Sequence, residues 1–183
     1  MPLTKGEAVF LQAALEGEIA YLVCHIQKVN PKATGRVGYS ALMHASENGH
    51  LKAVEYLLPY SDANAQNRDG STALILAAEE GDLACVQALL PHTNPNIQNG
   101  RGYTALMAAV AYNRRECAVE LARVTNLSLL SKLGSSARHL ADTSDRVPNF
   151  GALIEEVARA ANERRTLELH IEVVPARPKA CRL

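Results

Sequence analysis

The chain has 183 residues, of which 48% are hydrophobic and only 4% aromatic, and it contains no tryptophan. This length suits one domain or one short repeat array, and the apolar share is too high for a wholly disordered chain. Basic and acidic residues both number 19, so no net charge favours nucleic acid or a membrane surface. A partner that binds through charge can therefore be inferred only from local patterns of charged residues in the sequence.

The cysteines form neither a Cys-x-x-Cys pair nor a zinc-ligand spacing; they are Cys24, Cys85, Cys117 and Cys181. The first residues lack the basic flank and apolar core of a signal peptide, and no apolar run reaches the roughly 18 residues of a membrane span. We therefore expect reduced thiols in the cytoplasm, with the nucleus as the alternative.

A pattern that begins with glycine and reads Gly-Tyr-Ser-Ala-Leu-Met-His-Ala in its second copy recurs every 32 residues. Clear copies begin at Gly38, Gly70 and Gly102, a weaker one at Gly134 and a degenerate one at Gly6. Four copies in one register do not arise by chance, so the sequence predicts an all-α solenoid of about five repeats over residues 1–162. The copies lie near 4–37, 38–69, 70–101, 102–133 and 134–162.

Each repeat is expected to contain two helices. Thr4 and Glu7 match a capping box at the start of the first one. In every clear copy two alanines, such as Ala41 and Ala45, share one helix face and let the next helix approach closely. The first helices are followed by residue types that tolerate the left-handed conformation at a helix end, namely Gly17, Gly49, Gly81 and Asn113. An apolar stripe then predicts the second helix, and Pro59 and Pro91 end two of these helices.

The order of glycine, Ser/Thr-Ala-Leu-Met, alanine, Gly49-His50, Leu-Leu and Asn-Ala-Gln-Asn resembles the ankyrin repeat. The resemblance is strong from residue 38 to about 142 and weaker over 4–37 and 143–162. It implies helix pairs joined by projecting loops, and a protein that binds partner proteins across the concave surface formed by loop tips and first helices.

The motif departs from the usual Thr-Pro-Leu-His of the family, because this chain has Thr/Ser-Ala-Leu-Met/Ile there. This form is similar to ankyrin arrays of some protozoan parasites. Only His139 occupies the place of the histidine that ties neighbouring loops in the family, so the departure puts the loop-to-loop hydrogen bonds in question.

The fifth copy carries charges where the others are apolar: Arg138 replaces a leucine, and Asp142 replaces a small or apolar residue. This predicts a C-terminal cap whose face meets water. Its last helix is expected from Phe150 to about Ala161, with Pro148 in the first turn.

Residues 163–183 leave the repeat. The alternation of apolar and polar residues from Leu167 to Val173 has the period of a strand. This segment is expected to be a packed or mobile tail, or else an edge strand that pairs with a partner or a second copy. The chain would then be a monomer or a dimer joined through the tail.

Partner contacts are expected at the loop tips and the exposed ends of the first helices, since the core columns serve packing. The candidate residues are Arg36, Tyr39, Glu47, Arg68, Asp69, Glu79, Glu80, Arg101, Tyr103, Tyr112 and Lys132. One hypothesis is that the basic tips meet acidic groups of a partner, with the tyrosines as anchors. The alternative is that the tips are solvated charges and that Tyr39 and Tyr103 pack against neighbouring loops.

The sequence contains no His-Glu-x-x-His, no phosphate-binding glycine loop and no Gly-x-Ser-x-Gly, so no catalytic residue, metal or cofactor is expected. Cys85 and Cys117 are interpreted as buried apolar side chains, and His50 as a cap at the helix junction. The expected function is a protein-interaction module or adaptor. The alternatives are an inhibitor or regulatory subunit of an enzyme such as a kinase, and a fragment of an enzyme.

Overall fold

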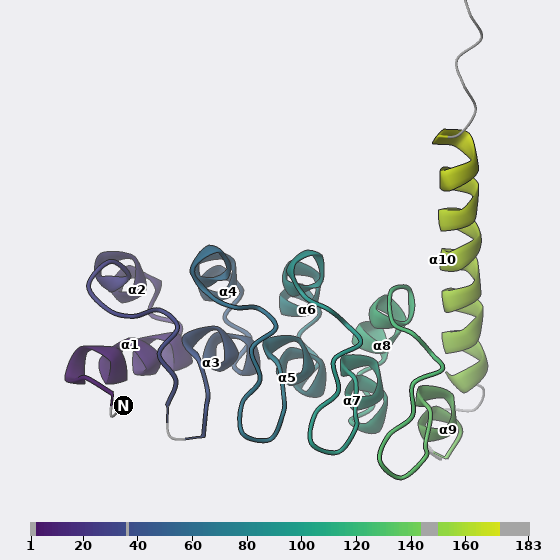
Figure 1. The fold of residues 1–183 in the computed structure, drawn as a ribbon, viewed down its shortest axis with the longest axis horizontal. Helices are drawn as coiled ribbons and strands as arrows, with labels where there is room; N and C mark the ends of the chain where they lie inside the picture. Colours follow the sequence, from purple (N-terminus) through teal and green to yellow (C-terminus); the bar gives the residue numbers. More distant parts are fainter. Residues whose placement is uncertain (1–2, 36, 144–149, 173–183) are drawn as a thin grey trace, which may run out of the picture.

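The computed structural model describes residues 3–35, 37–143 and 150–172, with side chains through Thr166. In this part of the chain ten α-helices form five stacked pairs (Figure 1). The first helices of the pairs are α1 (Lys5–Glu16), α3 (Ala41–Glu47), α5 (Ala73–Glu80), α7 (Ala105–Ala111) and α9 (Ala137–Asp142). The second helices are α2 (Ile19–His25), α4 (Leu51–Leu57), α6 (Leu83–Leu89), α8 (Arg115–Ala122) and α10 (Phe150–Glu172). The prediction of an all-α solenoid of about five repeats is confirmed.

The first helices form one layer and α2, α4, α6 and α8 form the other, whereas α10 stands across the end of the stack (Figure 1). Single 3₁₀ turns, Leu58–Tyr60 and Leu90–His92, follow α4 and α6 and contain the two prolines predicted to end these helices. Between repeats the chain forms hairpin loops, here called fingers, near residues 34–40, 66–72, 98–104 and 130–136. They project from the first-helix layer away from the second helices (Figure 1).

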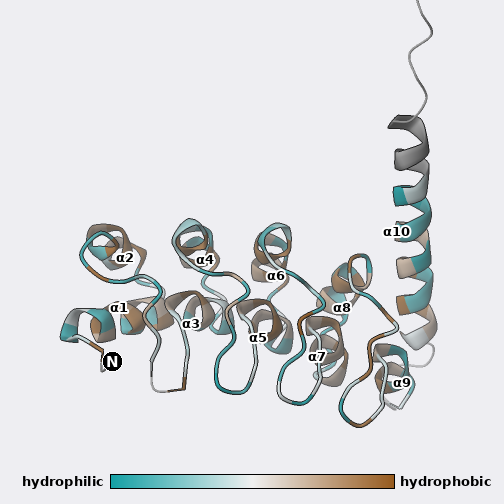
Figure 2. Cartoon of the chain, viewed as in Figure 1, coloured by the Kyte–Doolittle hydropathy of each residue, from teal (hydrophilic) through white to brown (hydrophobic). Residues whose placement is uncertain are grey.

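The core runs along the whole stack where first helices meet. The alanine column of Ala41, Ala73, Ala105 and Ala137 is at most 2% exposed, so neighbouring helices approach closely enough for Leu42, Leu74 and Leu106 to be buried as well. Figure 2 shows hydrophobic residues on the helices of both layers, hydrophilic ones over much of α10, and a mixture of both along the fingers. Continuous burial across repeats explains why no single pair needs its own closed core.

The helix ends are fixed as the sequence predicts. The Thr4 side chain accepts a hydrogen bond from the Glu7 amide at 3.2 Å, and Glu7 accepts one from the Thr4 amide at 2.8 Å, which completes the capping box. The N-caps of the other first helices also accept a bond from the amide three residues on; they are Ser40, Thr72, Thr104 and Ser136. The four predicted left-handed residues Gly17, Gly49, Gly81 and Asn113 all have positive φ.

A column of side chains joins each second helix to the repeat before it. Equivalent positions hold His50, Asp82 and Arg114, whose side chains lie next to the left-handed glycines Gly17, Gly49 and Gly81. His50 Nε2 is 2.9 Å from the carbonyl oxygen of Leu15, so His50 does cap a helix junction, and the helix it caps is α1 of the preceding repeat.

The fingers are tied together despite the altered motif. The Gln66 amide donates to the carbonyl oxygens of Gly70 at 2.6 Å and Gln98 at 3.1 Å. Gln98 repeats this with Gly102 at 2.6 Å and Leu130 at 2.8 Å. His139 is exposed, and its side chain has no hydrogen bond within the described residues. Loop-to-loop bonding is therefore present, and glutamine side chains supply it together with backbone bonds such as Lys132 N to Arg101 O.

The end of the array differs from the expectation in its last helix. α10 continues to Glu172 rather than ending near Ala161, so the predicted edge strand from Leu167 is wrong for residues 167–172. Extending an existing helix is easier than starting a new element, and the run Ala160–Leu169 is rich in helix-forming residues. Val173 and the rest of the tail, like Pro148, lie outside the described residues.

The charges of the fifth repeat are exposed as predicted, and they also join α9 to α10. Arg138 Nη1 is 2.8 Å from Glu155 on α10, and Arg138 Nε is 3.3 Å from Asp142. Ile154 is fully buried against the stack. Among the described helices, α10 included, none is long and apolar enough to cross a membrane.

Candidate partner-binding groove

A groove of about 480 Å³ lies between the fingers and the ends of the first helices in the middle of the stack. It takes side chains from the second, third and fourth repeats. Its lining residues are Tyr39, Glu47, Asn67, Arg68, Asp69, Ser71, Leu76, Glu79, Asn99, Gly100, Arg101 and Tyr112. We call the side formed by Glu47, Leu76, Glu79 and Tyr112 the helix wall, and the side formed by Arg68, Asp69 and Arg101 the finger wall.

Tyr39 lines the groove and is held in place by its neighbours. Its hydroxyl donates a hydrogen bond to Glu47 Oε1 at 3.2 Å, and its ring centroid lies 5.1 Å from that of His44. Burial, and then the nearby Glu47 carboxylate, raise the pKa of Tyr39 to about 12. Its ring and hydroxyl are therefore already held by the array, and Tyr39 acts as a fixed part of the groove.

Glu79 lies in the last turn of α5, one 32-residue period after Glu47 at the end of α3. Burial raises the pKa of Glu79; the carboxylates of Glu80 and Glu47 raise it further, while Arg101 lowers it. Within the described residues no ion pair or hydrogen bond holds the Glu79 carboxylate. The helix wall thus presents a half-buried negative charge with no partner.

The finger wall is rigid because asparagine side chains organise each tip. Asn67 Oδ1 accepts bonds from the amides of Asp69 at 3.0 Å and Ser71 at 2.9 Å. Asn99 Oδ1 does the same for Arg101 at 2.9 Å and Tyr103 at 3.0 Å. Adjacent tips are joined by backbone bonds, including Gly100 N to Asp69 O at 2.6 Å. The arginine side chains therefore extend from a fixed backbone.

Seven of the eleven candidate contact residues meet in this groove: Tyr39, Glu47, Arg68, Asp69, Glu79, Arg101 and Tyr112. Three others lie elsewhere. Glu80 pairs with Arg114 at 3.9 Å, Tyr103 is half-buried against the core, and Lys132 is exposed but does not line the groove. Arg36 lies outside the described residues. Of the four basic tips that were predicted to form a row, the groove thus contains Arg68 and Arg101.

A family model for ankyrin repeats in three copies matches residues 10–99, 59–129 and 74–162. The chain belongs to the ankyrin-repeat family. A search of curated proteins found no match. Ankyrin repeats indicate a module that binds proteins and is typically non-catalytic, and they identify neither a particular partner nor a particular surface.

Some lining residues of this ankyrin array lie outside the predicted contact set. Asn67 and Asn99 are among them, and they hold the backbone of the finger wall in place. Leu76 is another; it stands in an apolar run of the sequence and lines the helix wall. The recurrence of asparagine three residues before the repeat glycine was the available signal for the finger wall.

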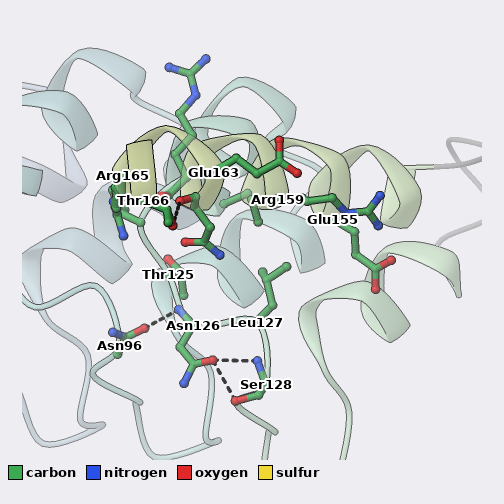
Figure 3. A pocket seen from close by; sticks show the side chains of 15 residues that line it. Asn96, Thr125, Asn126, Leu127, Ser128, Glu155, Arg159, Glu163, Arg165 and Thr166 are labelled. Atoms are coloured by element: carbon green, nitrogen blue, oxygen red, sulfur yellow. Dashed lines mark hydrogen bonds between the residues drawn. The ribbon is translucent and has the colours of Figure 1, made fainter. Parts of the chain in front are cut away.

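A second, larger cavity of about 1100 Å³ lies between α10 and residues 122–128, at the end of the ankyrin stack (Figure 3). Most of its lining residues are polar or charged, and Arg165 on α10 donates to the carbonyl oxygen of Arg123 at 3.0 Å. It contains none of the candidate contact residues. Across the residues with described side chains, no group of three or more His, Cys, Asp and Glu could hold a metal ion.

Proposed function

We propose that this ankyrin array is an adaptor or interaction module whose partner protein binds in the groove between the finger wall and the helix wall. The observation that carries the proposal is the convergence of charged and aromatic side chains from three successive repeats on one concave surface. Packing within the array accounts for Tyr39 but not for the exposed side chains of this set. Tyr112 in particular is 48% exposed although it is large and apolar.

The residue types support binding rather than mere solvation. Tyrosine and arginine are enriched among residues that dominate interface energies, and each can contribute about 2 kcal/mol or more when a partner desolvates it. Tyr112 and Arg101 have this character and lie in the same groove. Rigid walls reduce the conformational entropy lost on binding, and the bonded finger tips supply such rigidity.

We further propose that Arg68 and Arg101 meet acidic groups of the partner, as the basic tips suggest. Free thiols at Cys24, Cys85 and Cys117 support a reducing compartment, the cytoplasm or the nucleus, as the place of action. Tyr103 and Glu80 are not part of the proposed contact, because the core and Arg114 already engage them.

Site-specific photo-crosslinking tests the proposal. A crosslinking phenylalanine analogue is placed at Tyr112 in the groove or at Tyr60, a tyrosine of similar exposure in the second-helix layer. The expected result in cells of the source organism is a discrete crosslinked protein from Tyr112 and none of that mass from Tyr60. Equal crosslinking from both positions, or none from Tyr112, would contradict the proposal.

A further inference from the structure

The two walls of the groove carry opposite charges. Glu47 and Glu79 lie on the helix wall, whereas Arg68 and Arg101 lie on the finger wall, with Asp69 beside them. The two glutamates come from equivalent positions of neighbouring repeats, one 32-residue period apart. They are close enough that the charge of Glu47 disfavours ionisation of Glu79. The electrostatic potential across the groove therefore changes from negative at the helix wall to positive at the finger wall.

The two glutamates of the helix wall stand where a negative charge is unfavourable. Glu47 is the last residue of α3, and Glu79 lies in the last turn of α5, where the helix carbonyl groups add further negative potential. A cation would be favoured at both positions, and a carboxylate is disfavoured. Burial further disfavours the ionised form of the carboxylate, because a half-buried charge loses part of its hydration.

The neighbouring arginines form no ion pair with Glu79. Arg114 lies near Glu79, yet its Nε donates to the Glu79 backbone carbonyl at 2.8 Å and its Nη2 faces the Glu80 carboxylate. The charge of Arg101 lowers the pKa of Glu79 and offsets part of its negative charge, but Arg101 makes no direct contact with the carboxylate. The space between the walls is thus left for a group from outside.

Aromatic and apolar surface lies beside the two glutamates. Tyr112 is 48% exposed and supplies most of this surface, whereas Leu76 lines the groove but is only 4% exposed. A long basic side chain can lay its methylene groups on such surface while its charge meets the carboxylates, and a tyrosine face attracts a cation. An acidic side chain would find no charge complement on this wall.

We propose that the groove recognises a partner segment that inserts one arginine or lysine between Glu47 and Glu79 and presents an acidic residue to Arg68 and Arg101. This inference rests on the proposed function and names the chemistry of its partner. Oppositely charged walls fix the direction in which the segment lies, because the reversed orientation places like charges together. A purely acidic segment would satisfy the finger wall only.

A small-molecule probe tests the helix wall without knowledge of the partner. Acetyl-arginine amide, its neutral analogue acetyl-citrulline amide and acetyl-glutamate amide are titrated into the full chain, with the Glu and Tyr signals followed by NMR. We expect the arginine probe to shift the Glu47 and Glu79 signals most strongly. Glu79→Gln should weaken its binding about tenfold, as expected for the loss of one charge-assisted hydrogen bond.

The matched control is Glu80→Gln, which removes a neighbouring carboxylate that faces Arg114 instead; it should change binding of the arginine probe less than twofold. Equal affinity for arginine and citrulline probes, an unchanged affinity in Glu79→Gln, or a preference for the glutamate probe would each overturn the inference. Both variants should keep the melting temperature of the parent chain, since neither side chain is part of the core.

Crosslinking from Tyr112 separates this inference from the proposed function. If Glu79→Gln strongly reduces the yield of the crosslinked partner and Glu80→Gln does not, the inference is supported. If the yield in Glu79→Gln equals that of the parent chain, the groove still binds a protein but the cation contact is refuted. A second variant, Glu79→Lys, should abolish capture by placing a like charge against the inserted side chain.

Discussion

The side chain of Arg114 covers Gly81, the left-handed residue that ends α5 in the preceding repeat. A Cβ atom built on Gly81 would lie 2.6 Å from Arg114 Cδ, closer than two unbonded carbons can approach. The same arginine donates to the Glu79 carbonyl oxygen at 2.8 Å. One residue thus covers the end of the first helix of one repeat and stands at the start of the second helix of the next.

The first prediction follows from this contact. Gly81→Ala should lower the free energy of unfolding by about 2–3 kcal/mol, because it combines a left-handed alanine with a clash against Arg114. Gly134→Ala is the control, since Gly134 also has positive φ but has nothing within 4 Å of its Cβ position. Gly134→Ala should lower the free energy of unfolding by only about 1 kcal/mol. Urea unfolding measures both values, and equal losses would show that the Arg114 contact has no energetic weight.

The finger ties give a second prediction. Gln98→Ala removes the bonds to Gly102 and Leu130 and should destabilise the chain by about 1 kcal/mol. The amide of Lys132, which donates to Arg101 in the same pair of fingers, should exchange its hydrogen faster. Gln87→Ala, at an exposed position on α6, is the control and should leave that amide unchanged. Unaltered exchange in Gln98→Ala would mean that the backbone bonds alone tie the fingers.

The last helix, α10, gives a third prediction. Ile154→Ala on α10 should cost about 2–5 kcal/mol, because Ile154 is fully buried and its truncation leaves a cavity. Leu153→Ala, at a neighbouring position that is 43% exposed, should cost less than about 1 kcal/mol. Thermal and urea unfolding of the two variants measure the contrast. A similar small loss in both would show that α10 does not pack on the stack.

The fourth concerns Tyr39, whose pKa is raised to about 12 by burial and by Glu47. The folded chain holds this proton more tightly than the unfolded chain does, so the resulting stability is present below pH 10 and is lost as the pH rises towards 12. Carbon-13 NMR of the tyrosine rings from pH 9 to 12 should show Tyr39 ionising near the top of this range. Glu47→Gln should lower that pKa, and Tyr39→Phe should remove the transition. A Tyr39 midpoint near 10 would contradict the hydrogen bond to Glu47.

The fifth prediction concerns the reactivity of the cysteines. Burial raises the pKa of Cys85 to about 12 and that of Cys117 to about 11, so neither forms a reactive thiolate at neutral pH. In a Cys181→Ser background, a thiol reagent should modify only the exposed Cys24 of the folded chain. The other two should react after unfolding. Rapid modification of three thiols in the native protein would refute their placement in the core.

The sequence predicted the parts of the fold that repeat. The alanine column of Ala41 and Ala73, the left-handed positions and the charged cap residue Arg138 follow from the fixed 32-residue period, because each repeat must pack on a neighbour of the same shape. It could not predict which residues tie the fingers. The missing histidine suggested weaker bonding, whereas Gln66 reaches a carbonyl of the next finger, a contact that depends on the spacing between repeats.

The tail shows a different limit. A run of seven alternating residues from Leu167 fits a strand, and its composition also suits the continuation of a helix. Only the preceding turns of α10 decide between the two. Seven of the residues that line the groove were predicted, but their grouping was not. Arg68 and Arg101 were expected to form a basic row, and the structure places them in one groove with Glu47 and Glu79.

The bonds between fingers have a consequence for how the array responds to stress. Each bond joins residues of adjacent repeats only, so the chain should behave as a line of coupled units that frays from its ends inward. The groove spans the three central units, which are the last to open. A partner that contacts all three of these repeats would hold them together, and unfolding that begins in a terminal repeat would then stop at the first repeat that the partner contacts.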